Sequence, residues 1–152
     1  MNRAAAPSIP IDSLIFGYGP MLPFIAAAFA CWAMPAPWPG IAVWLVTIWG
    51  AMILTFVGGV RRGFGFGNRG ACTGVEIATM LVYFITAGLA LLLPWPALSL
   101  FLLAAGFALA AILDTHAALK GNAPAHFAAL RIPQFGIATV SLLIAGLSLY
   151  SR

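Results

Sequence analysis

Charged side chains are the scarcest feature of this sequence: only ten of its 152 residues are Asp, Glu, Lys or Arg, or 7%. A soluble domain carries about 25%, and ten charged side chains cannot cover the surface of a water-exposed globule of this length. Hydrophobic residues make up 63%, whereas intrinsic disorder requires low hydrophobicity. The composition therefore excludes a soluble globular protein and a disordered chain, and it indicates a membrane protein.

Groups that carry enzyme chemistry are equally few, with three acidic residues, two histidines and two cysteines. No Ser-His-Asp, Cys-His or paired-carboxylate set is recognisable. His116 and His126 lack Cys, Asp or Glu at metal-ligand spacing. Cys31 and Cys72 fall at opposite ends of the expected bundle, too far apart for a disulfide. We expect no catalytic residue, no cofactor, no metal and no enzymatic activity.

The net charge of +4 does not indicate nucleic-acid binding, because seven scattered basic residues do not form the dense basic face that such binding needs. Residues 65–70 spell GxGxxG, the dinucleotide-binding fingerprint. That fingerprint requires a preceding strand and a βαβ unit, and here an expected membrane helix precedes it. Neither nucleic acid nor a dinucleotide is an expected ligand.

Five apolar runs are long enough to cross a membrane, which takes about 17–25 mainly apolar residues. They predict helices at about 14–34, 40–60, 75–93, 96–120 and 132–150. Gly121 is a good helix stop for the fourth. Short links rich in Pro or Gly separate several runs and make neighbouring helices antiparallel. The sequence predicts an all-α bundle of five transmembrane helices in a single membrane domain, residues 1–152.

Basic residues are distributed unevenly over the two ends of this bundle. The N-terminal segment and the loops at 61–74 and 114–131 share one side and hold six of the seven basic residues. The positive-inside rule places that side, with the N-terminus, in the cytoplasm and the C-terminus outside. Four of the five tryptophans cluster at the opposite side, as an aromatic belt would: Trp32, Trp38, Trp44 and Trp95.

Small residues recur at every fourth position of the second run, which favours close helix packing in lipid. They are Thr47, Ala51, Thr55, Gly59, Gly63 and Gly67. Each step of four residues rotates the face by about 40°, so the stripe serves only locally. We expect Gly59 and Gly63 to pack against another helix of this chain, with homo-oligomerisation as the alternative.

Asp114 closes the fourth apolar run, and a carboxylate at that depth prefers a cationic partner. Arg61 and Arg62 end the second run on the same side. Consecutive helical residues point about 100° apart, so one arginine can face the bundle while the other reaches lipid phosphates. We expect an ion pair between Asp114 and one of the two arginines. A substrate or proton site is the alternative.

The first run is interrupted near its cytoplasmic end by Pro20 and Pro23. Proline cannot donate to the carbonyl four residues earlier, and a freed carbonyl in lipid must be satisfied by protein, water or ligand. The break lies at a depth similar to that of Asp114. Tyr18 and Gln134 lie there too, so we expect a polar pocket formed by Tyr18, Arg61, Arg62, Asp114 and Gln134.

Two further carboxylates are explained as helix caps. Thr73 and Glu76 have the spacing of a capping box, and Asp12 precedes the first apolar run, where its charge favours the helix start.

The sequence resembles a family of small polytopic membrane proteins of unknown function that includes transmembrane protein 69. The resemblance rests on residues 17–24 (GYGPMLPF), 49–61 (WGAMILTFVGGVR), 106–109 (GFAL) with Asp114 downstream, 123–127 (APAHF) and 130–131 (LR). It spans most of the chain, and its middle block is the most specific. It implies five helices in a bacterial or mitochondrial membrane, with no established activity, cofactor or catalytic residue.

These observations favour a non-enzymatic accessory, structural or assembly component of a membrane complex. The alternative is a small-solute or ion carrier or channel that uses the cytoplasmic-side pocket. A weaker third hypothesis is a membrane enzyme or lipid-modifying protein that uses Asp114 with Arg61. The expected partners are the lipid bilayer and either another membrane protein or a second copy. Heavy use of Ala, Gly and Arg is typical of GC-rich bacterial genomes, so the expected location is the bacterial inner membrane.

Overall fold

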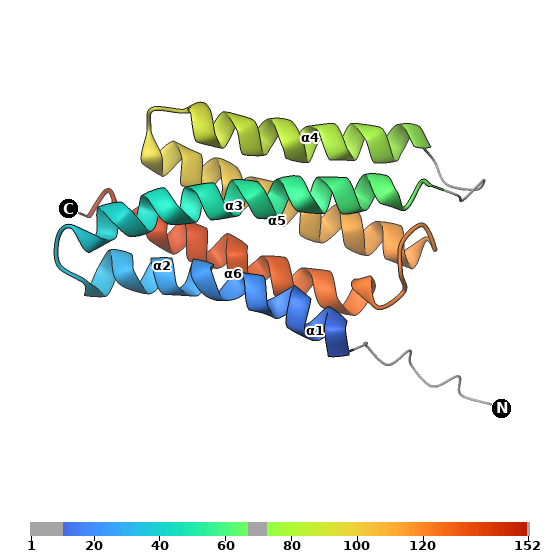
Figure 1. Ribbon diagram of the computed structural model, residues 1–152, viewed down its shortest axis with the longest axis horizontal. Coiled ribbons are helices and arrows are strands. Elements are labelled where there is room, and N and C mark those ends of the chain that lie inside the picture. The colour runs from blue at the N-terminus through green and yellow to red at the C-terminus, as the bar shows by residue number, and fades with distance from the viewer. Residues whose placement is uncertain (1–10, 67–72, 152) are drawn as a thin grey trace.

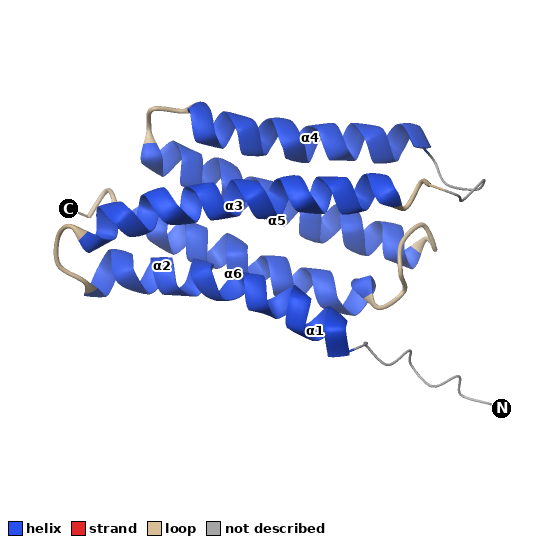
Figure 2. Cartoon of the chain, viewed as in Figure 1, coloured by secondary structure: helices blue, strands red, loops and turns tan. Residues whose placement is uncertain are grey.

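The computed structural model describes residues 11–66 and 73–151, and every regular element in them is helical (Figures 1 and 2). Five helices are long and apolar enough to cross a membrane, as predicted. The elements are α1 (Ile11–Tyr18), the 3₁₀ helix η1 (Gly19–Met21), α2 (Leu22–Ala33), α3 (Trp38–Gly63), α4 (Thr73–Leu92), α5 (Pro96–Leu119) and α6 (Phe127–Ser148).

The first span consists of α1, η1 and α2, because Pro20 lies inside the 3₁₀ turn and Pro23 follows at the start of α2. In a 3₁₀ turn each N–H reaches back three residues instead of four, and the Leu22 N–H accordingly donates to the Gly19 carbonyl. The prolines therefore tighten the helix without ending it. α1 leaves the axis of α2 at this turn (Figure 1).

The helices run up and down as a bundle whose two ends differ (Figure 1). α2 packs on α3 and α6, α5 packs on α3, α4 and α6, and α1 packs on α6. The start of α1, the ends of α3 and α5 and the starts of α4 and α6 gather at one end. We call this end the basic end, because Arg61, Arg62, Lys120 and Arg131 lie there.

The middle of the bundle is filled by three aromatic rings. Phe24 of α2, Phe107 of α5 and Phe135 of α6 are completely buried. Phe24 meets Phe107 edge-on with 5.3 Å between ring centroids, and Phe107 lies 5.7 Å from Phe135. Such edge-to-face and tilted pairs are favourable geometries for aromatic rings. The three rings tie α2, α5 and α6 together.

Helix ends follow the sequence closely at α5 and less closely at α6. Gly121 has φ 75° and closes α5 as predicted. The Asn122 N–H donates to the Ala117 carbonyl and the Gly121 N–H to Ala118, which is the Schellman pattern. α6 begins at Phe127, five residues before the predicted start, so Arg131 lies within a membrane-crossing helix.

The prediction that Gly59 and Gly63 pack inside the chain is wrong. A Cβ added at either position would meet nothing within 4 Å, whereas one added at Gly58 would lie 3.3 Å from the Met80 carbonyl oxygen of α4. The buried face of α3 passes through Gly50 and Gly58, because the four-residue stripe rotates away from the face that the helix buries.

Candidate functional site

The ion pair of Asp114 is made by Arg131 of α6, with 3.6 Å between Nε and Oδ2. Asp114 is only 1% exposed and Arg131 only 7%. The prediction that Arg61 or Arg62 would be this partner is therefore corrected. In the described ranges, Arg131–Asp114 is the ion pair observed within 4.0 Å. Arg131 reaches inward because α6 begins a full turn before it.

Arg131 is held in place by three further side chains, those of Gln134, Phe127 and Phe135. Its Nη1 donates to Gln134 Oε1 at 2.9 Å, and Gln134 Nε2 donates to the Gly17 carbonyl at 2.9 Å. The guanidinium carbon lies 3.9 Å from the ring centre of Phe127 and 5.0 Å from that of Phe135. The two rings offer cation–π contacts. Asp114, Arg131, Gln134 and the Gly17 backbone thus form one chain of polar contacts from α5 through α6 to α1.

Two more polar side chains face Asp114 from α3 and α4. The Tyr83 hydroxyl donates to Asp114 Oδ1 at 3.4 Å, and Tyr83 is completely buried. Arg61 is 5% exposed and lies close enough to interact electrostatically with Asp114 and Tyr83. Its Nε and Nη1 have no hydrogen-bond partner within residues 11–66 and 73–151. The interior therefore holds two guanidinium groups around one carboxylate.

Arg62 points elsewhere, as the 100° turn between consecutive residues requires. It is half-buried, and its guanidinium lies 4.4 Å from the ring centre of Phe66. A Cβ added at Gly65 would meet both the Arg62 Nη1 and the carboxylate oxygen of Glu76, so glycine leaves room for these two side chains. Glu76 is 1% exposed. The Thr73 side chain of the predicted capping box lies outside the described residues.

Tyr18 does not join the polar cluster: it is half-buried at the end of α1, and its backbone neighbour Gly17 makes the contact instead. In a 3₁₀ turn the residue at position 20 would donate to the Gly17 carbonyl, and because Pro20 has no N–H that carbonyl accepts from Gln134 instead. A second carbonyl at the break, that of Pro20, accepts a hydrogen bond from Trp49 Nε1 at 2.9 Å. Side chains of α6 and α3 thus donate hydrogen bonds to the two backbone carbonyls at the proline break.

A cavity of about 450 Å³ lies beside this cluster. We call it the basic-end cavity. Thirteen residues from the first span, α3 and α6 line it: Ser13, Phe16, Gly17, Pro20, Met21, Ile53, Phe56, Val57, Val60, Phe127, Leu130, Arg131 and Gln134. Its walls come from α1, η1, α3 and α6.

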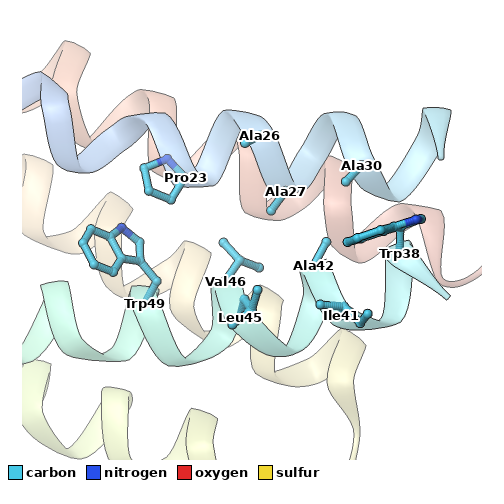
Figure 3. A pocket seen from close by; sticks show the side chains of 10 residues that line it. All are labelled: Pro23, Ala26, Ala27, Ala30, Trp38, Ile41, Ala42, Leu45, Val46 and Trp49. Atoms are coloured by element: carbon cyan, nitrogen blue, oxygen red, sulfur yellow. The ribbon is translucent and has the colours of Figure 1, made fainter.

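A second cavity of about 370 Å³ lies between α2 and α3, on the other side of the Trp49–Pro20 hydrogen bond. We call it the α2–α3 groove, and Figure 3 shows its lining: Pro23, Ala26, Ala27, Ala30, Trp38, Ile41, Ala42, Leu45, Val46 and Trp49. The alanines of α2 leave the space that the aromatic and aliphatic side chains of α3 border. No charged side chain lines it.

Metal ligands do not gather in the described ranges, where no group of three or more His, Cys, Asp or Glu side chains is found. His126 instead contacts Ser13, with 3.3 Å between Nε2 and Oγ, and so ties α1 to the start of α6. His116 is exposed on α5.

Sequence reasoning missed two members of the cluster, Arg131 and Tyr83. A helical signal for Arg131 was present: Phe127, Arg131 and Phe135 recur at intervals of four and therefore share a face. The residues predicted for the site and also found in or beside it are Arg61, Asp114 and Gln134. No comparable sequence signal marks Tyr83, which lies in a uniformly apolar run.

A family profile described as "Protein of unknown function (DUF3429)" matches residues 9–147. The chain belongs to this family. The match runs from just before α1 into the last turn of α6, so it covers all five candidate spans and every member of the polar cluster. No curated protein and no solved structure matches the chain. The DUF3429 description names no activity and does not name the transmembrane protein 69-like proteins.

Proposed function

We propose that this DUF3429 protein is a non-enzymatic integral membrane protein of the bacterial inner membrane, where it serves as an accessory or assembly component of a membrane complex. The observation that carries the proposal is the closed centre of the bundle. Phe24, Phe107 and Phe135 fill it and are completely buried, and the basic-end cavity and the α2–α3 groove lie between neighbouring helices. A closed and packed centre supports a scaffold more than a conduit.

The outward face of α3 supports a packing role. Thr55, Gly59 and Gly63 are exposed, and added side chains at the two glycines would meet nothing in this chain. Small residues at this spacing allow a second helix to approach closely in lipid. Resemblance to the transmembrane protein 69-like proteins is consistent with this role and stays an expectation. In this proposal the basic end faces the cytoplasm, in line with the positive-inside rule.

Affinity purification in a mild detergent tests the proposal. We expect a stoichiometric membrane-protein partner that is lost in Gly59→Leu and kept in Met52→Leu, an exposed change on the same helix. Both variants should unfold at the wild-type temperature, because neither position is buried in the chain. A chain that purifies alone from its native membrane, with both variants behaving identically, would contradict the accessory role.

The carrier or channel hypothesis remains as a second candidate because the basic-end cavity is bordered by Arg131 and Gln134. Flux through proteoliposomes distinguishes it from the first. The closed centre predicts a flux no greater than that of protein-free vesicles. Saturable flux that is lost in Arg131→Lys would favour the carrier and overturn the scaffold proposal.

A further inference from the structure

The basic-end cavity opens sideways, toward the surface that faces lipid in a membrane. α1 diverges from α3 on the far side of the 3₁₀ turn (Figure 1), and residues of both helices line the cavity together with residues of η1 and α6. Its rim includes Phe16 and Phe56, which are 78% and 68% exposed. A molecule within the bilayer therefore has direct access from the side.

The lining of the cavity changes from apolar to polar toward the end of the bundle. Ile53, Phe56 and Val57 give it an apolar wall on α3, whereas Arg131 and Gln134 give it a polar floor on α6. Arg131 is four residues, about 6 Å, from the start of α6. The floor thus lies near the depth of lipid headgroups, and the apolar wall lies at the depth of acyl chains.

Two buried arginines interact with Asp114, and of these Arg131 lines the cavity while Arg61 lies behind its lining. Arg61 and Arg131 are both buried and share the single carboxylate of Asp114. The Arg131 Nε is 3.6 Å from Asp114, longer than a charge-assisted hydrogen bond, and it has no hydrogen-bond partner in the described residues. Buried arginines are stable when their charge is paired and their donors are satisfied. A further anion would satisfy both requirements.

We infer that the basic-end cavity binds an anionic phospholipid from the adjacent leaflet. Its phosphate oxygens accept hydrogen bonds from the Arg131 guanidinium, and Arg61 adds a second buried positive charge beside Asp114. One acyl chain lies in the gap between α1 and α3, bordered by Phe16 and Phe56. This inference does not depend on the proposed accessory role, because it concerns a ligand of the single chain.

The shape of the cavity favours a lipid over a soluble anion. Ten of the thirteen lining residues have no polar side chain, the exceptions being Ser13, Arg131 and Gln134. A small anion would leave most of this apolar surface uncovered. A zwitterionic lipid would fill the space but would add no net negative charge at the floor.

Native mass spectrometry of the full chain in detergent micelles tests the inference with three probes. We expect one dioleoyl phosphatidylglycerol to bind each chain at least about tenfold more tightly than dioleoyl phosphatidylcholine, since both carry a phosphate but the choline cation cancels its charge beside the buried arginines. Inorganic phosphate at the same concentration should neither bind nor compete. Equal binding of the two lipids would overturn the inference, as would competition by inorganic phosphate.

Two variants separate the site from non-specific lipid binding. Val60→Trp fills the cavity without changing charge, and its matched control Val75→Trp makes the same change on the exposed face of α4 at the same end. We expect Val60→Trp to lose the tight phosphatidylglycerol and Val75→Trp to keep it, with both folded as judged by circular dichroism. Retention of the lipid in Val60→Trp would overturn the inference.

Arg131→Lys tests the polar contact itself. It keeps the positive charge opposite Asp114 but removes the planar fork of donors that suits phosphate oxygens. We expect phosphatidylglycerol to bind about tenfold more weakly. Wild-type phosphatidylglycerol affinity in this variant would contradict the assignment of the phosphate to Arg131.

Discussion

The basic-end cavity and the α2–α3 groove are neighbours of similar size, about 450 and 370 Å³, yet they differ in chemistry. Both border α3, and the hydrogen bond from Trp49 to the Pro20 carbonyl lies between them. The groove is closed behind by alanines of α2 (Figure 3). The basic-end cavity is closed by α6, which contributes Arg131 and Gln134.

The backbone and the side chains supply separate properties of this site, namely its space and its selectivity. Space arises where α1 swings away at the 3₁₀ turn or where α2 carries only alanines. Selectivity arises from the first turns of α6, where Arg131 is fixed by Asp114, Gln134 and two phenylalanine rings. A groove without such groups can accommodate an acyl chain but cannot select a headgroup.

Asp114→Leu should have the largest effect, because it leaves Arg61 and Arg131 buried without a counter-charge. Breaking a buried ion pair costs about 3–5 kcal/mol, to be measured as loss of unfolding free energy in detergent. The double variant Asp114→Leu/Arg131→Met should recover part of that loss. Val46→Ala in the α2–α3 groove provides the contrast, at about 1 kcal/mol. Similar losses at the two sites would mean that the cavities differ little.

Charge reversal should identify the partner of Asp114. Combining Asp114→Arg with Arg131→Asp should restore part of the stability lost by the single variants, since the 3.6 Å pair is rebuilt with opposite polarity. Combining Asp114→Arg with Arg61→Asp should restore less of the lost stability. Unfolding temperatures of the two double variants are the measurement, and better rescue through Arg61 would restore the partner expected from the sequence.

Gln134→Leu should cost about 1–3 kcal/mol, because it leaves the buried Gly17 carbonyl without its donor. Gln134→Glu is the informative companion: it can accept from Arg131 but cannot donate to Gly17. We expect both variants to unfold at lower temperature than the wild type. A stable Gln134→Leu protein would show that the link from α6 to α1 is dispensable.

Trp49→Phe should have the smallest effect, about 1 kcal/mol, since it removes the indole N–H donor to the Pro20 carbonyl and trims a ring that is only partly buried. Trp44→Phe, an exposed change on the same helix, should stay within about 0.5 kcal/mol. Equal unfolding temperatures for both variants would indicate that the boundary between the two cavities needs no hydrogen bond.

The fold was largely predictable because lipid imposes strong rules on sequence. Spans need long apolar runs, and breakers such as Gly121 mark their ends. The start of α6 was misjudged because Arg131 was counted as a loop charge, yet burial beside Asp114 makes the arginine compatible with a membrane helix. Pro20 and Pro23 correctly indicated an irregular helix. Which backbone carbonyl is left without a helical donor depends on the 3₁₀ geometry of the turn.

The polar cluster was predictable in location but not in its pairing. Asp114, Arg61 and Gln134 share a depth that can be counted from helix ends. Which guanidinium reaches Asp114 depends on helix rotation, and a shift of one residue changes direction by about 100°. For the same reason the exposed Gly59 was confused with the buried Gly58, whose position is set by the approach of Met80.

The lipid preference of two cavity-filled variants shows whether the basic-end cavity holds the anionic phospholipid. Val60→Trp fills the basic-end cavity and Ala42→Trp fills the α2–α3 groove. Each is reconstituted in nanodiscs of equal parts dioleoyl phosphatidylglycerol and dioleoyl phosphatidylcholine, and retained lipid is counted by native mass spectrometry after release. We predict that Val60→Trp loses the enrichment of phosphatidylglycerol while Ala42→Trp keeps the wild-type ratio. Loss of enrichment in Ala42→Trp alone, or in neither variant, would contradict the account.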